Sequence, residues 1–420
     1  MHVNLVGINH RTAPIAIREK AAIRTEELHD TLSLLGDYMP HGIILSTCNR
    51  TEIYSIDTDG RHAEEASLSF LKAHLNTADN DLYQYLYVFK DETAVEHLFH
   101  VASGLDSMII GEFEVLGQVR KALSAAEKAR LADLRLRHLF QSAVRTGRRV
   151  REETGISKNA LSVSSVAVDQ ASRIIGDLNN CQILVIGAGE AGRLVAKAAK
   201  DRGVSRIVVA SRTEESASAL AAELGGKPAS MNNLEEEMST CNMVVTCADA
   251  PRSILDTGIV EDVMLNRPEL PMVIIDIAIP RNVAPAVAQI NNVFLHNIDD
   301  LTQISGANRQ QREGEIRQSD EIVADELARF ISWQHDFEVR PVVRALTKKA
   351  EKIRTSQLNS TLKKLRLVSD EDRHSLEMMT KAIVSKILQN PIQYLKTQGN
   401  TNGDYAEIID ELFQLDADKS

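Results

Sequence analysis

Cysteine is scarce in this chain of 420 residues, which has four: Cys48, Cys181, Cys241 and Cys247. So few thiols in so long a chain do not form the disulfide framework of a small secreted protein. The spacing within CNMVVTC is poor for zinc, and no companion ligands lie nearby. We interpret the last three cysteines as small hydrophobic residues at strand ends and predict no metal site.

Long hydrophobic runs are also missing. No apolar run approaches the roughly 18 residues that a helix needs to span a bilayer. The first residues, MHVNLVGINHRTAP, show an alternating strand pattern without the features of a signal peptide. We therefore expect a cytoplasmic protein. The net charge of −11 argues against non-specific binding of nucleic acid over the whole surface.

The middle of the chain predicts a parallel sheet. Apolar runs recur there in CQILVIG, RIVVAS, NMVVTCA, PMVIIDIAIP and NVFLHN, with helical stretches between them. Strands that are apolar on both faces and alternate with helices indicate a sheet covered on both sides. The prediction is an α/β multidomain protein in which residues 157–296 form a Rossmann-like domain.

The first part of the chain, residues 1–156, has an α+β pattern. Alternating strands are expected near Val3–Asn9, Ile43–Thr47 and Glu52–Asp57, interleaved with helices. Two strongly helical stretches follow between about residues 112 and 153.

Residues 297–420 show few strand signals. Helical stretches with spaced apolar residues predict a long connecting helix and a helical dimerisation domain, and Arg340-Pro341 is expected to break the first helix. Such helices pack either on a second copy of the chain or as a cap on the same copy.

The segment GAGEAG has the G-x-G-x-x-G spacing, with glycines at 187, 189 and 192. It follows a predicted strand and opens a predicted helix, which is the context a dinucleotide site requires. Gly187 permits the tight turn, Gly189 lets a pyrophosphate approach the backbone, and Gly192 allows close packing of the helix. The predicted cofactor-binding residues of this loop are Gly187, Ala188, Gly189, Glu190, Ala191 and Gly192.

The end of the next predicted strand bears on which dinucleotide binds. An NAD site places Asp or Glu there to hold the ribose 2′-hydroxyl, whereas this chain has VVASRTEE. Ser211 and Arg212 are suited to hydrogen-bond a 2′-phosphate instead. The pattern favours NADPH, although Glu214 and Glu215 follow closely.

Cys48 lies in a polar stretch, STCNRTE, between two apolar runs. If the chain stays extended, Arg50 at i+2 projects to the same side as Cys48, where it would lower the thiol pKa or bind a substrate carboxylate. The residues alone leave two readings open, a nucleophile or a small residue in a turn. His97 and His100 fall on the side of a predicted helix opposite its apolar stripe, facing either solvent or a cleft.

The motifs GINHRTAP, LSTCNRTE, HVASGLDSMIIGE, LGQV, GAGEAG, ASRT and DIAIPR, in this order, resemble those of the glutamyl-tRNA reductases. The resemblance implies reduction of tRNA-bound glutamate to glutamate-1-semialdehyde with NADPH, the first step of the five-carbon route to tetrapyrroles. It also implies a homodimer, and as a further partner the aminomutase that takes the semialdehyde next.

By this resemblance Cys48 is the nucleophile and His97 is a histidine that supports activity. The residues that match the family's glutamate-binding positions are Thr47, Asn49, Arg50, Ser107, Glu112, Phe113, Glu114 and Gln118. One stretch departs from the family, because Glu112-Phe113-Glu114 stands where Glu-Pro-Gln is usual. A charged Glu114 in the pocket would repel the γ-carboxylate of the substrate.

The residues that the resemblance assigns are suited to the reduction of an aminoacyl ester. A thiolate converts the aminoacyl ester to a thioester, whose carbonyl accepts a hydride more readily, and an aldehyde is then released.

The stretch LRLRHLFQSAVRTGRRVRE carries six arginines, which either contact tRNA phosphates or pair with nearby acids. The alternative functions are a reductase of a small acyl substrate without RNA, and a non-catalytic dinucleotide-sensing dimer.

Overall fold

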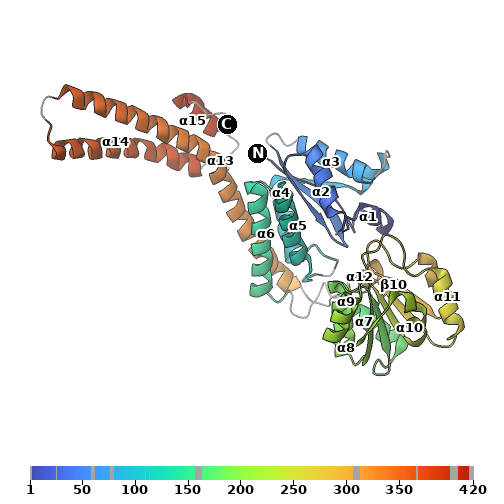
Figure 1. Ribbon diagram of the computed structural model, residues 1–420. Coiled ribbons are helices and arrows are strands. Elements are labelled where there is room, and N and C mark those ends of the chain that lie inside the picture. The colour runs from blue at the N-terminus through green and yellow to red at the C-terminus, as the bar shows by residue number, and fades with distance from the viewer. Residues whose placement is uncertain are drawn as a thin grey trace. The chain divides into compact units, whose positions relative to one another are not determined.

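The computed structural model describes residues 2–24, 26–57, 62–75, 80–108, 110–112, 114–156, 163–305, 313–365, 368–397 and 405–415. Phe113, one of the predicted site residues, lies outside these ranges. The chain divides into two compact units, residues 1–327 and residues 328–420. The first unit holds two sheets, and the second is helical (Figure 1).

The N-terminal sheet is antiparallel, with the strand order β2-β3-β1-β4. Its strands are β1 (His2–Asn9), β2 (Gly42–Ser46), β3 (Arg50–Asp57) and β4 (Tyr87–Lys90). The first three agree with the predicted strands to within about two residues. The short β4 was not predicted, because four residues carry little periodicity.

Helices pack on both faces of this sheet. They are α1 (Ile15–Ala21), α2 (Leu28–Tyr38), α3 (His62–His74), α4 (Asp91–Ser103), α5 (Glu114–Lys128) and α6 (Leu134–Glu153), and a 3₁₀ turn spans Asn80–Tyr85. Ile53 of β3 packs with residues of α2 and α3, whereas its neighbour Tyr54 meets Phe140 of α6 edge to face. Since side chains alternate along a strand, Arg50, Glu52 and Tyr54 share the second face.

Close packing of α4 on α6 depends on Gly147. A Cβ at this position would lie 2.4 Å from the carbonyl oxygen of Ala102 in α4, so only glycine allows this approach. Arg151, one turn further along α6, donates hydrogen bonds to the carbonyl oxygens of Ala102 and Glu112. These contacts fix α4 and the loop that follows it.

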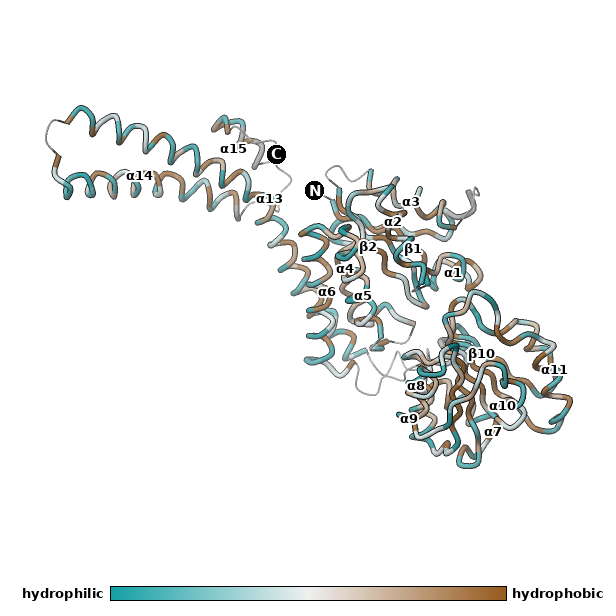
Figure 2. Tube along the Cα trace, in the orientation of Figure 1, coloured by the Kyte–Doolittle hydropathy of each residue, from teal (hydrophilic) through white to brown (hydrophobic). Residues whose placement is uncertain are grey.

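The second sheet is parallel, with the order β10-β9-β8-β5-β6-β7, and its strands are strongly hydrophobic (Figure 2). The strands are β5 (Gln182–Ile186), β6 (Arg206–Ala210), β7 (Lys227–Ala229), β8 (Met243–Thr246), β9 (Met272–Asp276) and β10 (Val293–Asn297). Five of them were predicted. β7 contains Pro228, and it lies at the edge, where a missing N–H is tolerated.

The helices and 3₁₀ turns of this domain form two hydrophobic layers with the sheet. They are α7 (Val163–Ile175), α8 (Glu190–Asp201), α9 (Glu214–Leu224), Met231–Asn233, α10 (Leu234–Thr240), α11 (Thr257–Leu265), Pro285–Gln289 and α12 (Ile298–Ser305). Strand order reverses between β5 and β8, so their carboxyl ends border the crevice in which doubly wound sheets bind ligands. Cys181, Cys241 and Cys247 lie beside strand ends, as predicted.

The predicted helix break at Arg340-Pro341 is wrong, since α13 (Glu313–Lys364) runs through Pro341. Val339 and Leu346, on either side of the proline, are buried with residues of α14 (Asp370–Thr397) and α15 (Tyr405–Phe413). This packing outweighs the hydrogen bond that a proline removes from a helix. No helix in the described ranges is both long enough and apolar enough to cross a membrane.

Candidate active site

Cys48 lies in the turn of residues 47–49 that joins β2 to β3. The hydroxyl of Thr47 accepts hydrogen bonds from the backbone N–H groups of Asn49 (3.1 Å) and Arg50 (3.2 Å). The carbonyl oxygen of Asn49 accepts one from the N–H of His10 (3.0 Å). The turn is therefore held at several points, with the half-buried Cys48 in its middle.

Arg50 does not act on Cys48 as expected. The turn interrupts the extended chain between them, and the Arg50 side chain is buried on the sheet, 2% exposed. Its Nη1 atom donates to Glu52 (2.8 Å) and to Asp106 (3.0 Å). Two carboxylates thus already occupy the arginine predicted to bind the glutamate.

The cation beside Cys48 is Arg18 of α1, which the sequence patterns did not reveal. Its Nη1 donates to the carbonyl oxygen of Cys48 (3.1 Å), and its Nη2 pairs with Asp299 of α12 (2.6 Å). Burial raises the pKa of the Cys48 thiol, the carboxylates of Glu112 and Glu114 raise it further, and Arg18 opposes them. Cys48 therefore rests as a neutral thiol.

A buried carboxylate, Glu52, holds His97 in place. Glu52 Oε1 lies 2.8 Å from His97 Nε2, and the Glu52 carboxylate also accepts hydrogen bonds from Arg50, Tyr54 and Tyr87. Burial opposes the charge of Glu52, but Arg50 and then His97 keep its pKa well below the usual range. An ionised carboxylate only accepts hydrogen bonds, so His97 Nε2 carries a proton and donates it.

The two predicted histidines have different surroundings. His97 is nearly enclosed, in ring contact with Tyr87 and Phe89, and its Nδ1 lies 4.0 Å from Asp106 Oδ2. His100 instead lies 3.2 Å from Asp320 of α13. Only His97 belongs to the site. Glu52 could have been found from the sequence, because it lies at i+2 from Arg50 on one face of a strand.

Ser107 and Glu112 belong to the loop after α4. Gly104 ends α4 in the left-handed region (φ 74°), and its carbonyl oxygen accepts a hydrogen bond from Gly111 N–H (2.9 Å). Burial raises the pKa of Glu112, while a hydrogen bond from the Ser107 side chain lowers it. The loop thus presents an acidic group close enough to act on Cys48.

Glu114 begins α5, and Gln118 follows it one turn later. Burial, then the charges of Glu112 and Glu190, raise the pKa of Glu114 to about 7. Below that pH Glu114 is a neutral acid with an O–H donor. Above it, Glu114 is an anion in a pocket predicted to take a carboxylate.

The GAGEAG loop joins β5 to α8 at the crevice of the second sheet. A Cβ at Gly187, whose φ is 110°, would lie 2.7 Å from the backbone nitrogen of Ala248, and one at Gly192 would lie 2.4 Å from Cys247 Sγ. Around Gly189 there is space, since a Cβ there would come no closer than 3.9 Å to any neighbouring atom, and no side chain caps α8. The N-terminus of α8 is thus open to a pyrophosphate. Ala188, Glu190 and Ala191 complete this loop.

Ser211 and Arg212 follow the end of β6, as predicted. Arg212 is largely exposed, and its Nη2 pairs with Glu26 Oε1 at 3.0 Å. An exposed pair of this kind contributes about 0–1 kcal/mol, so a phosphate can replace the carboxylate. Among the described residues, no group of three or more His, Cys, Asp and Glu side chains is arranged to hold a metal ion.

A doubly wound sheet with an open glycine loop, together with a domain that carries a cysteine on a fixed turn, defines an oxidoreductase of the dehydrogenase class. Three family models match the chain. Residues 6–154 match the N-terminal domain of glutamyl-tRNA(Glu) reductase, residues 169–304 match shikimate/quinate 5-dehydrogenase, and residues 318–415 match the glutamyl-tRNA(Glu) reductase dimerisation domain.

Curated relatives that match over almost the whole chain are also glutamyl-tRNA reductases. Glutamyl-tRNA reductase of Natranaerobius thermophilus is 37% identical over 94% of this chain and 87% of its own, and that of Moorella thermoacetica is 37% identical over 100% and 96%. The solved glutamyl-tRNA reductase from Methanopyrus kandleri has 32% identity and a TM-score of 0.48, covering 96% of this chain and 99% of that one.

This chain belongs to the glutamyl-tRNA reductase family. The predicted oxidoreductase class and the predicted place of the enzyme at the first step of tetrapyrrole biosynthesis are confirmed. Residues 169–304 form a domain of the type that binds nicotinamide dinucleotides, and the chain carries the family's dimerisation domain.

The raised pKa of Glu114 predicts a pH-dependent KM. Above pH 7 the ionised Glu114 should repel the glutamate carboxylate, so KM for glutamyl-tRNA should rise about fivefold to tenfold between pH 6 and pH 8, which corresponds to about 1–1.4 kcal/mol. Glu114→Gln should remove this rise. Steady-state kinetics measure it, with the exposed Glu65→Gln in α3 as the control that keeps the wild-type profile. An unchanged profile in Glu114→Gln would show that Glu114 does not face the substrate.

Proposed function

We propose that this protein reduces glutamyl-tRNA(Glu) to glutamate-1-semialdehyde with NADPH, through a thioester on Cys48. The observation that carries the proposal is the fixed turn of Cys48, which lies between Arg18 and the acidic loop of Glu112 and Glu114 in a chain of this family. An aminoacyl ester and a thiol exchange readily, and a thioester carbonyl accepts hydride more readily than an ester.

The reaction runs in two stages. The Cys48 sulfur bonds to the carbonyl carbon of the ester, the bond to the tRNA 3′-oxygen breaks, and the proton of the thiol passes to that oxygen. When bound, NADPH supplies the hydride that reduces the thioester carbonyl. The bond from carbon to sulfur then breaks, the aldehyde leaves, and a proton restores the Cys48 thiol.

Glutamate binding involves the Cys48 turn and the loop after α4. The proposed contacts are Thr47, Asn49, Arg50, Ser107, Glu112, Glu114 and Gln118, and Phe113 is proposed from the resemblance alone. Arg50 can bind a substrate carboxylate only if Asp106 moves away from it. Asp106 would then keep its second partner, Arg11 (2.8 Å). The carboxylate of Asp106 therefore keeps a cationic partner when the substrate enters.

His97 acts as a positioning residue in this scheme. Its Nε2–H is directed to Glu52 and its Nδ1 lies 4.0 Å from Asp106 Oδ2, so the ring is held between two carboxylates. The ring buttresses Arg50, whose Nη1 lies 3.2 Å from His97 Nε2. His97 thus fixes the residue that directly follows the Cys48 turn.

NADPH binding is supported by the glycine loop and by the end of β6. Gly189 leaves room for the pyrophosphate, Gly187 and Gly192 allow the close packing of the loop, and Ser211 and Arg212 hold the 2′-phosphate. The NAD-type carboxylate is replaced by Ser211, the residue directly after β6.

Each of the three segments of the chain has its own role in the proposed function. Residues 1–156 hold the glutamate and carry out catalysis, residues 157–296 bind NADPH, and residues 297–420 form a homodimer. Large apolar side chains exposed on α14 within the C-terminal unit support the dimer, including Met379 (52%) and Ile387 (64%). The protein works in the cytoplasm and hands the semialdehyde to the aminomutase that consumes it.

Cys48→Ser tests the covalent mechanism. The variant should form semialdehyde at least roughly a thousandfold more slowly, because a serine ester is no better an electrophile than the substrate. Wild-type protein without NADPH should release free glutamate slowly as water intercepts the thioester. The buried Cys181→Ser is the control and should keep its activity. Full activity in Cys48→Ser would end the thioester proposal.

Arg212→Ala tests the cofactor assignment. Loss of a charge-assisted hydrogen bond to the 2′-phosphate should raise KM for NADPH about 10- to 100-fold and leave KM for NADH unchanged. Arg206→Ala, at the other end of the same strand, is the matched control. An equal effect on both cofactors would remove the assignment of Arg212 to the phosphate.

A further inference from the structure

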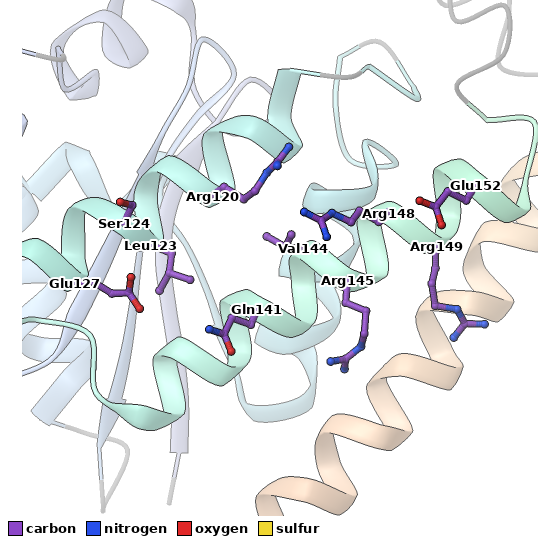
Figure 3. A pocket seen from close by; sticks show the side chains of 10 residues that line it. All are labelled: Arg120, Leu123, Ser124, Glu127, Gln141, Val144, Arg145, Arg148, Arg149 and Glu152. Carbon is purple, nitrogen blue, oxygen red and sulfur yellow. The ribbon is translucent and has the colours of Figure 1, made fainter.

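A groove of about 630 Å³ runs between α5 and α6 on the N-terminal domain. Four arginines line it, Arg120 from α5 and Arg145, Arg148 and Arg149 from α6 (Figure 3). Ser124 and Gln141 add neutral polar groups. Such a lining suits a chain of anions rather than an apolar ligand.

Most arginines of the predicted basic stretch are occupied by other partners. Arg145 and Arg149 both pair with Glu326 of α13 at 2.8 Å, and that carboxylate is fully buried. Arg137 pairs with Glu127 (2.7 Å). Burial lowers the pKa of Arg151 to about 10, and its guanidinium donates to backbone carbonyls. Of the two readings left open for this stretch, pairing with acids therefore holds for Arg137, Arg145 and Arg149.

Two arginines in the groove remain available. Arg120 and Arg148 are exposed, and neither side chain has a hydrogen bond or ion pair within the described part of the chain. In Figure 3 both guanidinium groups extend into the space between α5 and α6. They come from two helices whose packing is fixed, so their separation is preset before a ligand arrives.

We propose that this groove binds backbone phosphates of the tRNA substrate through Arg120 and Arg148, an inference that rests on the function proposed above. Arginine pairs with phosphate in a bidentate geometry. Contacts of this kind supply salt-dependent affinity without reading sequence.

The groove lies along α5, the same helix that carries two of the proposed glutamate contacts. Glu114 and Gln118 begin α5, and Arg120 lies six residues after Glu114, or about 9 Å along the helix. An RNA whose aminoacylated 3′ end lies at Cys48 can therefore lay its next nucleotides along α5. A protein partner would have no reason to follow this line from the pocket.

Two acids line the groove, and Glu127 already pairs with Arg137. Glu152 is exposed in its lining, and no ion pair or hydrogen bond engages its side chain within the described residues. A carboxylate there repels phosphate, so its removal should act in the opposite direction to the loss of an arginine. The two kinds of substitution are therefore expected to change KM for glutamyl-tRNA in opposite directions.

The experiment measures KM for glutamyl-tRNA, and the salt dependence of tRNA(Glu) binding by fluorescence anisotropy. Arg120→Ala/Arg148→Ala should raise KM roughly tenfold at low salt, keep kcat, and reduce the slope of log K against log salt by about 1.5–2. Glu152→Gln should lower KM. Arg173→Ala, an exposed arginine of α7, is the matched control and should change nothing.

The outcomes separate the two proposals. If wild-type protein reduces glutamyl-tRNA while the double variant keeps its KM and salt slope, the groove does not bind RNA, and a protein occupant is the remaining assignment. If wild-type protein neither binds nor reduces glutamyl-tRNA, the function itself fails. A fall in kcat of the double variant with KM unchanged would also overturn the groove proposal, since phosphate contacts away from the ester do not alter the chemical step.

Discussion

The buried carboxylate of Glu52 is the constraint on which the N-terminal domain depends. It gathers β3, β4 and α4 around one charge, through Arg50, Tyr54, Tyr87 and His97. Removing one partner of a buried charge typically costs about 3–5 kcal/mol, so these elements cannot shift independently. Arg50 directly follows the Cys48 turn, and this network therefore also decides where the thiol lies.

Neutralisation of a buried carboxylate also explains which arginines of the groove between α5 and α6 are already paired. Glu326 is fully buried, and Arg145 and Arg149 neutralise it. Their neighbour Arg148 pairs with no carboxylate among the described residues, so its charge is available to a phosphate. Arg18 beside Cys48 is neutralised in the same way, because it pairs with Asp299 while it donates to the Cys48 carbonyl oxygen.

Local patterns predicted most of the fold. Strand periodicity placed three N-terminal strands and five of the parallel strands, and the GAGEAG spacing placed the open end of α8. Short elements such as β4 carry too little pattern, and the proline at 341 was outweighed by packing of α13 on α14. At the site, the Cys48 turn was identified, but Arg18 and Arg120 were not. Their roles come from contacts between segments distant in sequence, which no local spacing encodes.

In the proposed mechanism, Cys48 carries the glutamyl group between tRNA and the hydride donor. The most direct measurement is mass spectrometry of acid-quenched protein after mixing with glutamyl-tRNA in the absence of NADPH. A glutamyl adduct is expected on the Cys48 peptide, and hydroxylamine should remove it. The adduct should disappear as semialdehyde forms when NADPH is added. Semialdehyde formation at the full rate, with no adduct on Cys48 at any time, would contradict this mechanism.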